Sequence, residues 1–162
     1  MARKFSHILV HHTASAPGVT LAELDAMHRA RGFAGIGYHY VILRSPQDNF
    51  TRGYLKAARP DTRSGAHAGS PRETLDGKAW NSLSIGMAVA GTFHPNLPHS
   101  EHLARGSELY ADVLAATVHL CRKYGIPAAN LRGHYEVKRT ACPGDWFELD
   151  DLKADVATAL ED

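Results

Sequence analysis

The sequence predicts an α/β domain in which a central mixed β-sheet is flanked by helices. Short apolar segments with strand character alternate along the chain with segments whose apolar residues recur at helical spacing. The chain has 162 residues and 44% of them are hydrophobic, which is the size and composition of one globular domain. Because no repeat, linker or low-complexity tract divides it, we expect residues 1–162 to form a single domain.

The first strand and helix are indicated near the N-terminus. Residues 6–12 contain a short continuous apolar run, which is typical of a strand covered on both faces. Thr20 and Glu23 then have the spacing of a capping box, which starts a helix. Apolar residues continue at helical spacing to about residue 31, where glycines end the helix.

The middle of the chain is expected to contribute three strands. Residues 38–44 alternate as a second strand, and residues 50–54 are expected to return beside it as the partner in a hairpin. Residues 56–81 are rich in Gly, Pro, Ser and Asp and are expected to be irregular. Residues 83–90 form the next predicted strand.

The last third is expected to hold two helices and a short strand. Residues 107–124 place apolar side chains on one stripe, and Gly125 stands where a C-terminal cap would lie. A short strand is predicted near residues 130–133. The chain then ends in a helix whose first apolar residue is Leu149.

Charge and hydropathy exclude several classes of function. The chain carries 18 basic and 17 acidic residues, so it lacks the basic character expected of a nucleic-acid-binding protein. No apolar run approaches the ~20 residues of a membrane-spanning helix, so we expect no stable membrane insertion. Behind the basic N-terminus, the apolar run at residues 8–10 is too short for a signal peptide.

Histidine is abundant, with 11 residues, and it is the commonest metal ligand in proteins. His11 and His12 directly follow the apolar run of the first strand. Adjacent side chains of a strand point to opposite faces, so only one of the two can point into a given site. The pair is equally compatible with a polar strand end that has no further role.

A second set of chemically capable residues lies before the last helix. His134 and Cys142 are joined by a short loop that can bring an imidazole and a thiolate to one ion. With His11 they would form a His₂Cys set with an open fourth position, as in catalytic zinc sites. Cys142 is alternatively a small buried hydrophobe, which is the role we expect for Cys121 on its helical stripe. Spacing alone leaves both interpretations open.

Five segments carry a resemblance to a known family. They are residues 8–13 (ILVHHT), 37–40 (GYHY), 65–68 (GAHA), 81–86 (NSLSIG) and 133–143 (GHYEVKRTACP). They occur in the family's order and span nearly the whole chain. On these motifs the chain resembles the zinc-dependent N-acetylmuramoyl-L-alanine amidases related to phage amidase-type lysozymes and peptidoglycan recognition proteins. The resemblance implies the α/β fold of that family.

The resemblance also implies roles for individual residues. It implies a zinc ion held by three ligands: His11, His134 and Cys142. It implies that Tyr38, the tyrosine of the GYH motif, assists catalysis. Two residues before the cysteine some members have lysine and others threonine, and here Thr140 would supply a neutral donor. Lys138 or Arg139 is a candidate to compensate for the missing charge.

Supporting roles are expected for several more polar residues. His67 is expected to line the substrate groove, with an exposed loop histidine as the alternative. Glu136 is a candidate hydrogen-bond partner of a ligand histidine, or else a surface charge. Asn81 and Ser84 are expected to hold the loop and strand, and His39 to be structural. The histidines that carry no motif are expected to be ordinary: His7, His28, His94, His99, His102 and His119.

The implied reaction is hydrolysis of the amide between the lactyl group of N-acetylmuramic acid and L-alanine in peptidoglycan. We expect a monomer that is made in a host cytoplasm and acts on the cell wall after release, as a phage endolysin does. The alternatives are a non-catalytic peptidoglycan-binding module of the same fold and a cytoplasmic amidase that recycles muropeptides. A metal-dependent nuclease is disfavoured by the near-zero net charge and the lack of an acidic metal cluster.

Overall fold

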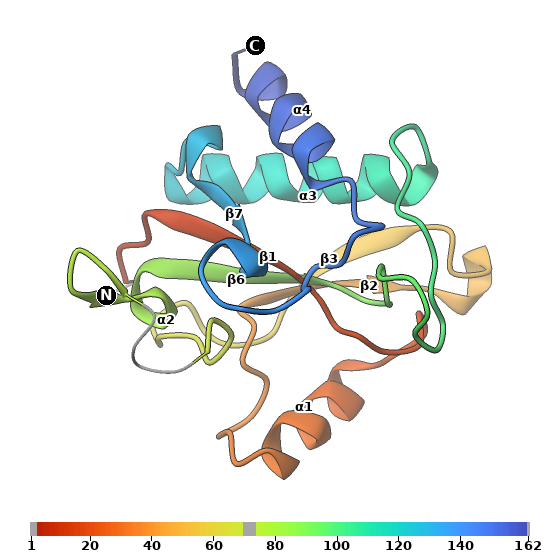
Figure 1. Ribbon diagram of the computed structural model, residues 1–162, viewed down its shortest axis with the longest axis horizontal. Coiled ribbons are helices and arrows are strands. Elements are labelled where there is room, and N and C mark those ends of the chain that lie inside the picture. The colour runs from red at the N-terminus through yellow and green to blue at the C-terminus, as the bar shows by residue number, and fades with distance from the viewer. Residues whose placement is uncertain (1–2, 70–73, 162) are drawn as a thin grey trace.

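A five-stranded mixed sheet forms the centre of the computed structural model, which describes residues 3–69 and 74–161 (Figure 1). The strand order is β3-β2-β6-β1-β7. The bounds are β1 (His7–His12), β2 (Tyr40–Arg44), β3 (Gly53–Ala57), β6 (Ser84–Val89) and β7 (Leu131–Gly133). β1 runs parallel to β6 and β7, β2 runs parallel to β6, and β3 is antiparallel to β2 at one edge. The predicted fold class is therefore confirmed.

Helices cover both faces of this sheet (Figure 1). On one face lie α3 (Glu108–Tyr124) and α4 (Leu149–Glu161). On the other lie α1 (Leu21–Ala30) and the short α2 (Trp80–Leu83). In the described ranges, no helix combines the length and apolar character needed to cross a bilayer.

The alternation of β1 decides which face carries the chemistry. Ile8 and Val10 are fully buried in the core that α3 and α4 share with the sheet. Leu9, between them, belongs to a separate apolar cluster with Trp80 on the opposite face. Because side chains of a strand alternate, His11 points to the same face as Leu9. His11 is the one residue of β1 in the candidate metal group described in the next subsection. It is directed toward the side of the sheet that α1 and α2 cover.

The predicted helix ends are present. The hydroxyl of Thr20 accepts a hydrogen bond from the backbone N–H of Glu23 at 3.1 Å, and the Glu23 carboxylate accepts from the backbone N–H of Thr20 at 3.3 Å. Ser107 caps α3 by accepting from the N–H of Tyr110 at 3.1 Å. Gly125 ends α3 in the left-handed conformation, with φ 65°.

Two strand boundaries differ from prediction. The strand expected over residues 38–44 begins at Tyr40. Its hairpin partner is β3 and pairs antiparallel as predicted, but it starts later than the expected residues 50–54. Asn49 and Phe50 have φ 52° and 61°, and this left-handed backbone lengthens the turn before pairing can begin.

The segment expected to be irregular, residues 56–81, contains regular structure. A small hairpin is formed by β4 (Thr74–Leu75) and β5 (Lys78–Ala79) around a turn in which Asp76 has φ 51° and Gly77 has φ 79°. The turn residues explain why composition alone indicates a loop. Residues 70–73 of this segment lie outside the described residues.

Candidate metal centre

His11, His134 and Cys142 meet in one place. One ligand atom from each lies within 4.8 Å of the others. His11 is supplied by β1, and His134 opens the short helix η3 (His134–Glu136) directly after β7. Cys142 is in the loop that follows. β1 and β7 are parallel neighbours, so the sheet itself brings the two histidines together, with ring centroids 4.5 Å apart.

The spacing of His11 and Cys142 fits two ligands of a tetrahedral zinc ion. Sγ of Cys142 is 3.7 Å from Nδ1 of His11. Bond lengths of about 2.3 Å to sulfur and about 2.0–2.1 Å to nitrogen would place two such ligand atoms about 3.6 Å apart. Two imidazoles and one thiolate also leave one coordination position open for water or substrate, as catalytic zinc sites do.

Protonation of the group depends on its burial. His11 is 1% exposed, and burial lowers the pKa of its imidazole well below the usual range, so the ring is neutral and able to bind a metal. Burial raises the pKa of the Cys142 thiol to about 12. A divalent cation at this position would favour the thiolate and offset that desolvation.

His12 does not join the group. Its Nδ1 accepts a hydrogen bond from the backbone N–H of Phe93 at 3.1 Å. His12 therefore ties the end of β1 to the segment after β6, on the face opposite His11. Of the two adjacent histidines, His12 has a structural role and His11 belongs to the candidate centre.

Tyr38 lies beside the group. Its ring centroid is 5.2 Å from that of His11 and 5.1 Å from that of His28. Burial raises the pKa of the Tyr38 phenol above its usual range, so the hydroxyl keeps its proton at neutral pH and can donate.

His28 is a neighbour of the site that sequence reasoning missed. Its Nδ1 accepts from the backbone N–H of Gly37 at 2.8 Å, which fixes the residue preceding Tyr38. His28 belongs to α1 and carries no motif, and nothing in its spacing indicates a contact with a segment nine residues away. Its role depends on how α1 docks against the sheet.

The centre lies in a cavity of about 300 Å³ with basic character. Arg31 and Lys138 line it, and none of the lining residues that the structure describes is acidic. The Lys138 side chain extends across Gly69, where an added Cβ would lie 2.5 Å from Nζ. Arg139 is exposed and is not among the residues that line this cavity. Lys138, rather than Arg139, therefore faces the centre.

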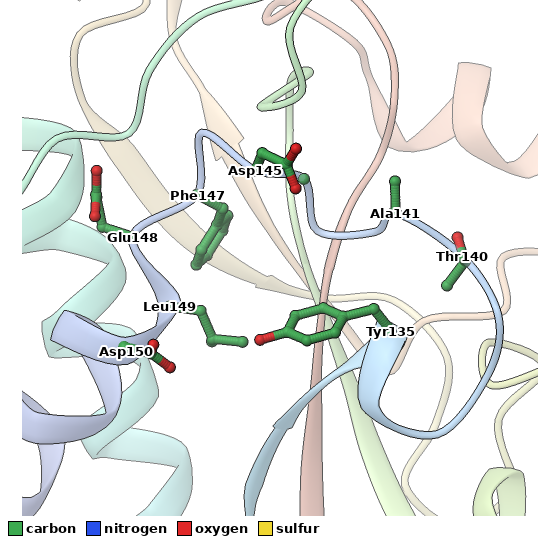
Figure 2. Close-up of a pocket in the computed structure, with 9 residues that line it drawn as sticks. Tyr135, Thr140, Ala141, Asp145, Phe147, Glu148, Leu149 and Asp150 are labelled. Atoms are coloured by element: carbon green, nitrogen blue, oxygen red, sulfur yellow. The ribbon is translucent and has the colours of Figure 1, made fainter.

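Thr140 lies in the wall between this cavity and a second one. The second cavity, of about 460 Å³, is lined by Tyr135, Thr140 and Ala141 together with the start of α4 (Figure 2). Figure 2 shows the Tyr135 ring below the loop that carries Cys142 and the carboxylate of Asp145 above it. The hydroxyl of Thr140 accepts from the backbone N–H of Cys142 at 3.3 Å, which leaves its own proton for a partner. Thr140 is the one described residue that lines both cavities.

His67 is buried, with 6% of its surface exposed, and it lines the cavity of the centre. Its Nδ1 lies 3.0 Å from Nε2 of His11. Burial lowers the pKa of His67 to about 3, so its ring is neutral. The alternative of a loop histidine exposed to water does not hold.

The remaining supporting residues lie next to the site without entering it. Glu136 accepts hydrogen bonds from the backbone N–H of Gly133 at 2.6 Å and from Lys153 at 2.8 Å, which fixes the turn that carries His134. His39 is fully buried, and its Nε2 lies 2.9 Å from the carbonyl oxygen of Arg63. This is the structural role expected of His39.

The fold and the site together define a class of protein. It is an α/β protein whose mixed sheet carries a His₂Cys group able to hold a metal ion with one coordination position left open, in a basic cavity. Residues 1–145 match the family described as N-acetylmuramoyl-L-alanine amidase. The chain belongs to this family.

The chain is similar to proteins from an insect and from a phage. A peptidoglycan-recognition protein of Drosophila simulans is 32% identical over 153 residues, covering 90% of this chain and 71% of the relative. The endolysin of Escherichia phage T7 is 29% identical over 151 residues, covering 90% and 87%. Among solved structures, the N-acetylmuramoyl-L-alanine amidase LysC from Clostridium intestinale URNW has a TM-score of 0.74 at 28% identity, covering 95% of this chain and 86% of that one.

Proposed function

We propose that this protein is a zinc-dependent N-acetylmuramoyl-L-alanine amidase that degrades bacterial peptidoglycan as an endolysin. The bond hydrolysed is the amide between the lactyl group of N-acetylmuramic acid and L-alanine. The observation that carries the proposal is the convergence of two histidines and one cysteine in a single cavity of a chain that belongs to the amidase family.

The proposed ligands of the ion are His11, His134 and Cys142. When bound, zinc activates water near neutral pH and polarises the carbonyl of the amide. Tyr38 stays protonated and donates a hydrogen bond to the oxyanion that develops on that carbonyl. Thr140 contributes a second, neutral hydroxyl donor in the wall of the same cavity. The basic character of the cavity suits the negative charge that develops during hydrolysis.

The relatives support the cell wall as the place of action. Endolysins of two phages match about nine-tenths of this chain. We therefore propose a monomeric enzyme that is made in the host cytoplasm and reaches the wall after release. The rival functions are a non-catalytic peptidoglycan-binding module and a cytoplasmic amidase that recycles soluble muropeptides.

Metal removal tests the proposal directly. The purified protein is stripped with a chelator, half is reloaded with zinc, and both samples are incubated with purified peptidoglycan. We expect new N-terminal alanine from the reloaded sample and at least ~100-fold less from the stripped one, since the ion supplies several kcal/mol of stabilisation to the transition state. Equal release from both samples, or wall binding without new alanine, would overturn the proposal. Cleavage of soluble muropeptides but not intact wall would indicate the recycling enzyme.

Substitution of Lys138 tests the source of positive charge in the cavity. Lys138→Met is expected to lower turnover about 10- to 100-fold, because a hydrogen bond to a charged group contributes about 1.5–3 kcal/mol. The matched control is Arg139→Met, which removes an exposed cation of the same loop and is expected to leave turnover unchanged. The reverse pattern would assign the compensating charge to Arg139.

A further inference from the structure

His67 and Ala68 contact the two histidines of the proposed metal site. Nδ1 of His67 lies 3.0 Å from Nε2 of His11. The carbonyl oxygen of Ala68 lies 3.0 Å from Nε2 of His134. One short segment therefore bonds to the far nitrogen of each imidazole, and neither His67 nor Ala68 belongs to the ligand group itself.

The hydrogen-bond directions follow from the two carbonyl oxygens, which can only accept. Ala68 accepts, so Nε2 of His134 carries a proton and Nδ1 is the nitrogen left to bind a metal. Nε2 of His67 lies 3.3 Å from the carbonyl oxygen of Ser84 and donates to it, so Nδ1 of His67 is an acceptor. His11 must then donate from Nε2. Its unprotonated Nδ1 is the nitrogen that faces Sγ of Cys142 at 3.7 Å.

Asn81 holds the backbone of this segment. Its Oδ1 accepts from the backbone N–H of His67 at 2.8 Å and from that of Ala68 at 2.7 Å. Its Nδ2 donates to the carbonyl oxygen of Gly69 at 3.3 Å. A single amide side chain thus bonds to three consecutive residues and fixes where the Ala68 carbonyl and the His67 ring lie.

Two glycines fix the His67 ring. A Cβ added at Gly65 would lie 2.2 Å from Cδ2 of His67, and one added at Gly86 would lie 2.6 Å from the same atom. The ring is packed directly against the backbone of β6 on one side and of its own loop on the other. In this position its Nδ1 is directed to Nε2 of His11.

We propose that His67, with the loop that Asn81 holds, positions the two histidine ligands by selecting the tautomer in which each presents Nδ1 to the metal. This inference rests on the proposed function, since it assumes that the group binds zinc. His67 then acts as a positioning residue rather than through a contact with substrate. Loss of such an outer partner typically weakens metal binding about 10- to 100-fold.

The first test is the tautomeric state of the zinc-free wild type, measured by long-range ¹H–¹⁵N correlation of the imidazole nitrogens. We expect the Nε2–H form for His11, His67 and His134. An Nδ1–H form of His11 or His134 overturns the proposal whether or not any variant folds. This measurement is independent of zinc binding and of activity, so it does not depend on the proposed function being correct.

The second test compares three variants by zinc dissociation constant, from competition with a chelator. His67→Phe keeps a ring but removes the acceptor, and is expected to weaken zinc binding about 10- to 100-fold and to mix the tautomers of His11. His67→Gln offers an acceptor and a donor together and is expected to restore both readouts. His39→Phe removes a buried imidazole whose ring is 5.7 Å from that of His67, and is expected to leave the zinc dissociation constant unchanged.

The outcomes separate the two proposals. Unchanged zinc affinity in His67→Phe, or an equal loss of affinity in His39→Phe, overturns the positioning role of His67. If the wild-type protein still binds zinc and releases alanine, the amidase proposal remains in place. Failure of the wild type to bind zinc overturns the amidase proposal instead. Metal-free thermal unfolding of each variant identifies any loss that comes from misfolding.

Discussion

Replacing His134 with alanine is expected to abolish both zinc binding and amide hydrolysis. His134 is one of three residues whose ligand atoms converge within 4.8 Å, so its loss leaves two ligands for an ion that needs three protein ligands in a catalytic site. We expect zinc to be lost on dialysis and alanine release to fall more than ~100-fold, since even outer partners of a metal ligand cost about 10- to 100-fold. Zinc content and new N-terminal alanine are measured on the same samples.

The matched control for this change is His119→Ala. His119 is exposed on α3, the helix that covers the face of the sheet opposite the candidate centre. It is expected to retain zinc and full activity. A His134→Ala protein that is folded and still binds one zinc ion would show that the ligand set is assigned wrongly.

Tyr38→Phe is expected to slow turnover about 10²- to 10³-fold while zinc stays bound, because removal of one oxyanion donor costs about 2.7–4 kcal/mol. Phenylalanine retains the ring that packs against His11 and His28 and removes only the hydroxyl. The effect is therefore expected in kcat, with little change in KM or in the zinc dissociation constant.

The control for the tyrosine is Tyr54→Phe, which removes the hydroxyl of a residue that is 49% exposed on β3. It is expected to behave as wild type. Unchanged kcat in Tyr38→Phe would remove Tyr38 from the proposed chemistry. Loss of zinc in that variant would instead give the Tyr38 hydroxyl a role in holding the ligand geometry.

Local signals in the sequence are enough to predict most of the fold. The capping box at Thr20 and the glycine at position 125 mark the two helix ends because these effects act within a few residues. The strand alternation also limits the His11–His12 pair to one residue per face, as the structure shows. The left-handed turn at Asn49 and Phe50 escapes prediction because neither residue needs that conformation.

Only part of the candidate site can be predicted from the sequence. Motifs indicate His11, His134 and Cys142, but the spacing of His134 and Cys142 alone allows either a ligand or a buried thiol. Two contacts join elements that meet only after the sheet forms: that of His28 with the GYH segment and the hydrogen bond between His11 and His67. The nitrogen that each imidazole would present to a bound ion depends on tertiary contacts, those of His11 with His67 and of His134 with Ala68, which local spacing does not predict.

The separation of the proposed ligands along the chain has a consequence for synthesis. His11 and Cys142 are 131 positions apart, and the pairing of β7 beside β1 brings the second histidine into place. A nascent chain whose synthesis has not yet reached β7 contains only one of the proposed ligands, His11, and cannot form the centre. Interrupted translation products are therefore expected to be inert. For an enzyme that destroys a cell wall, this confines lytic capacity to chains synthesised past Cys142.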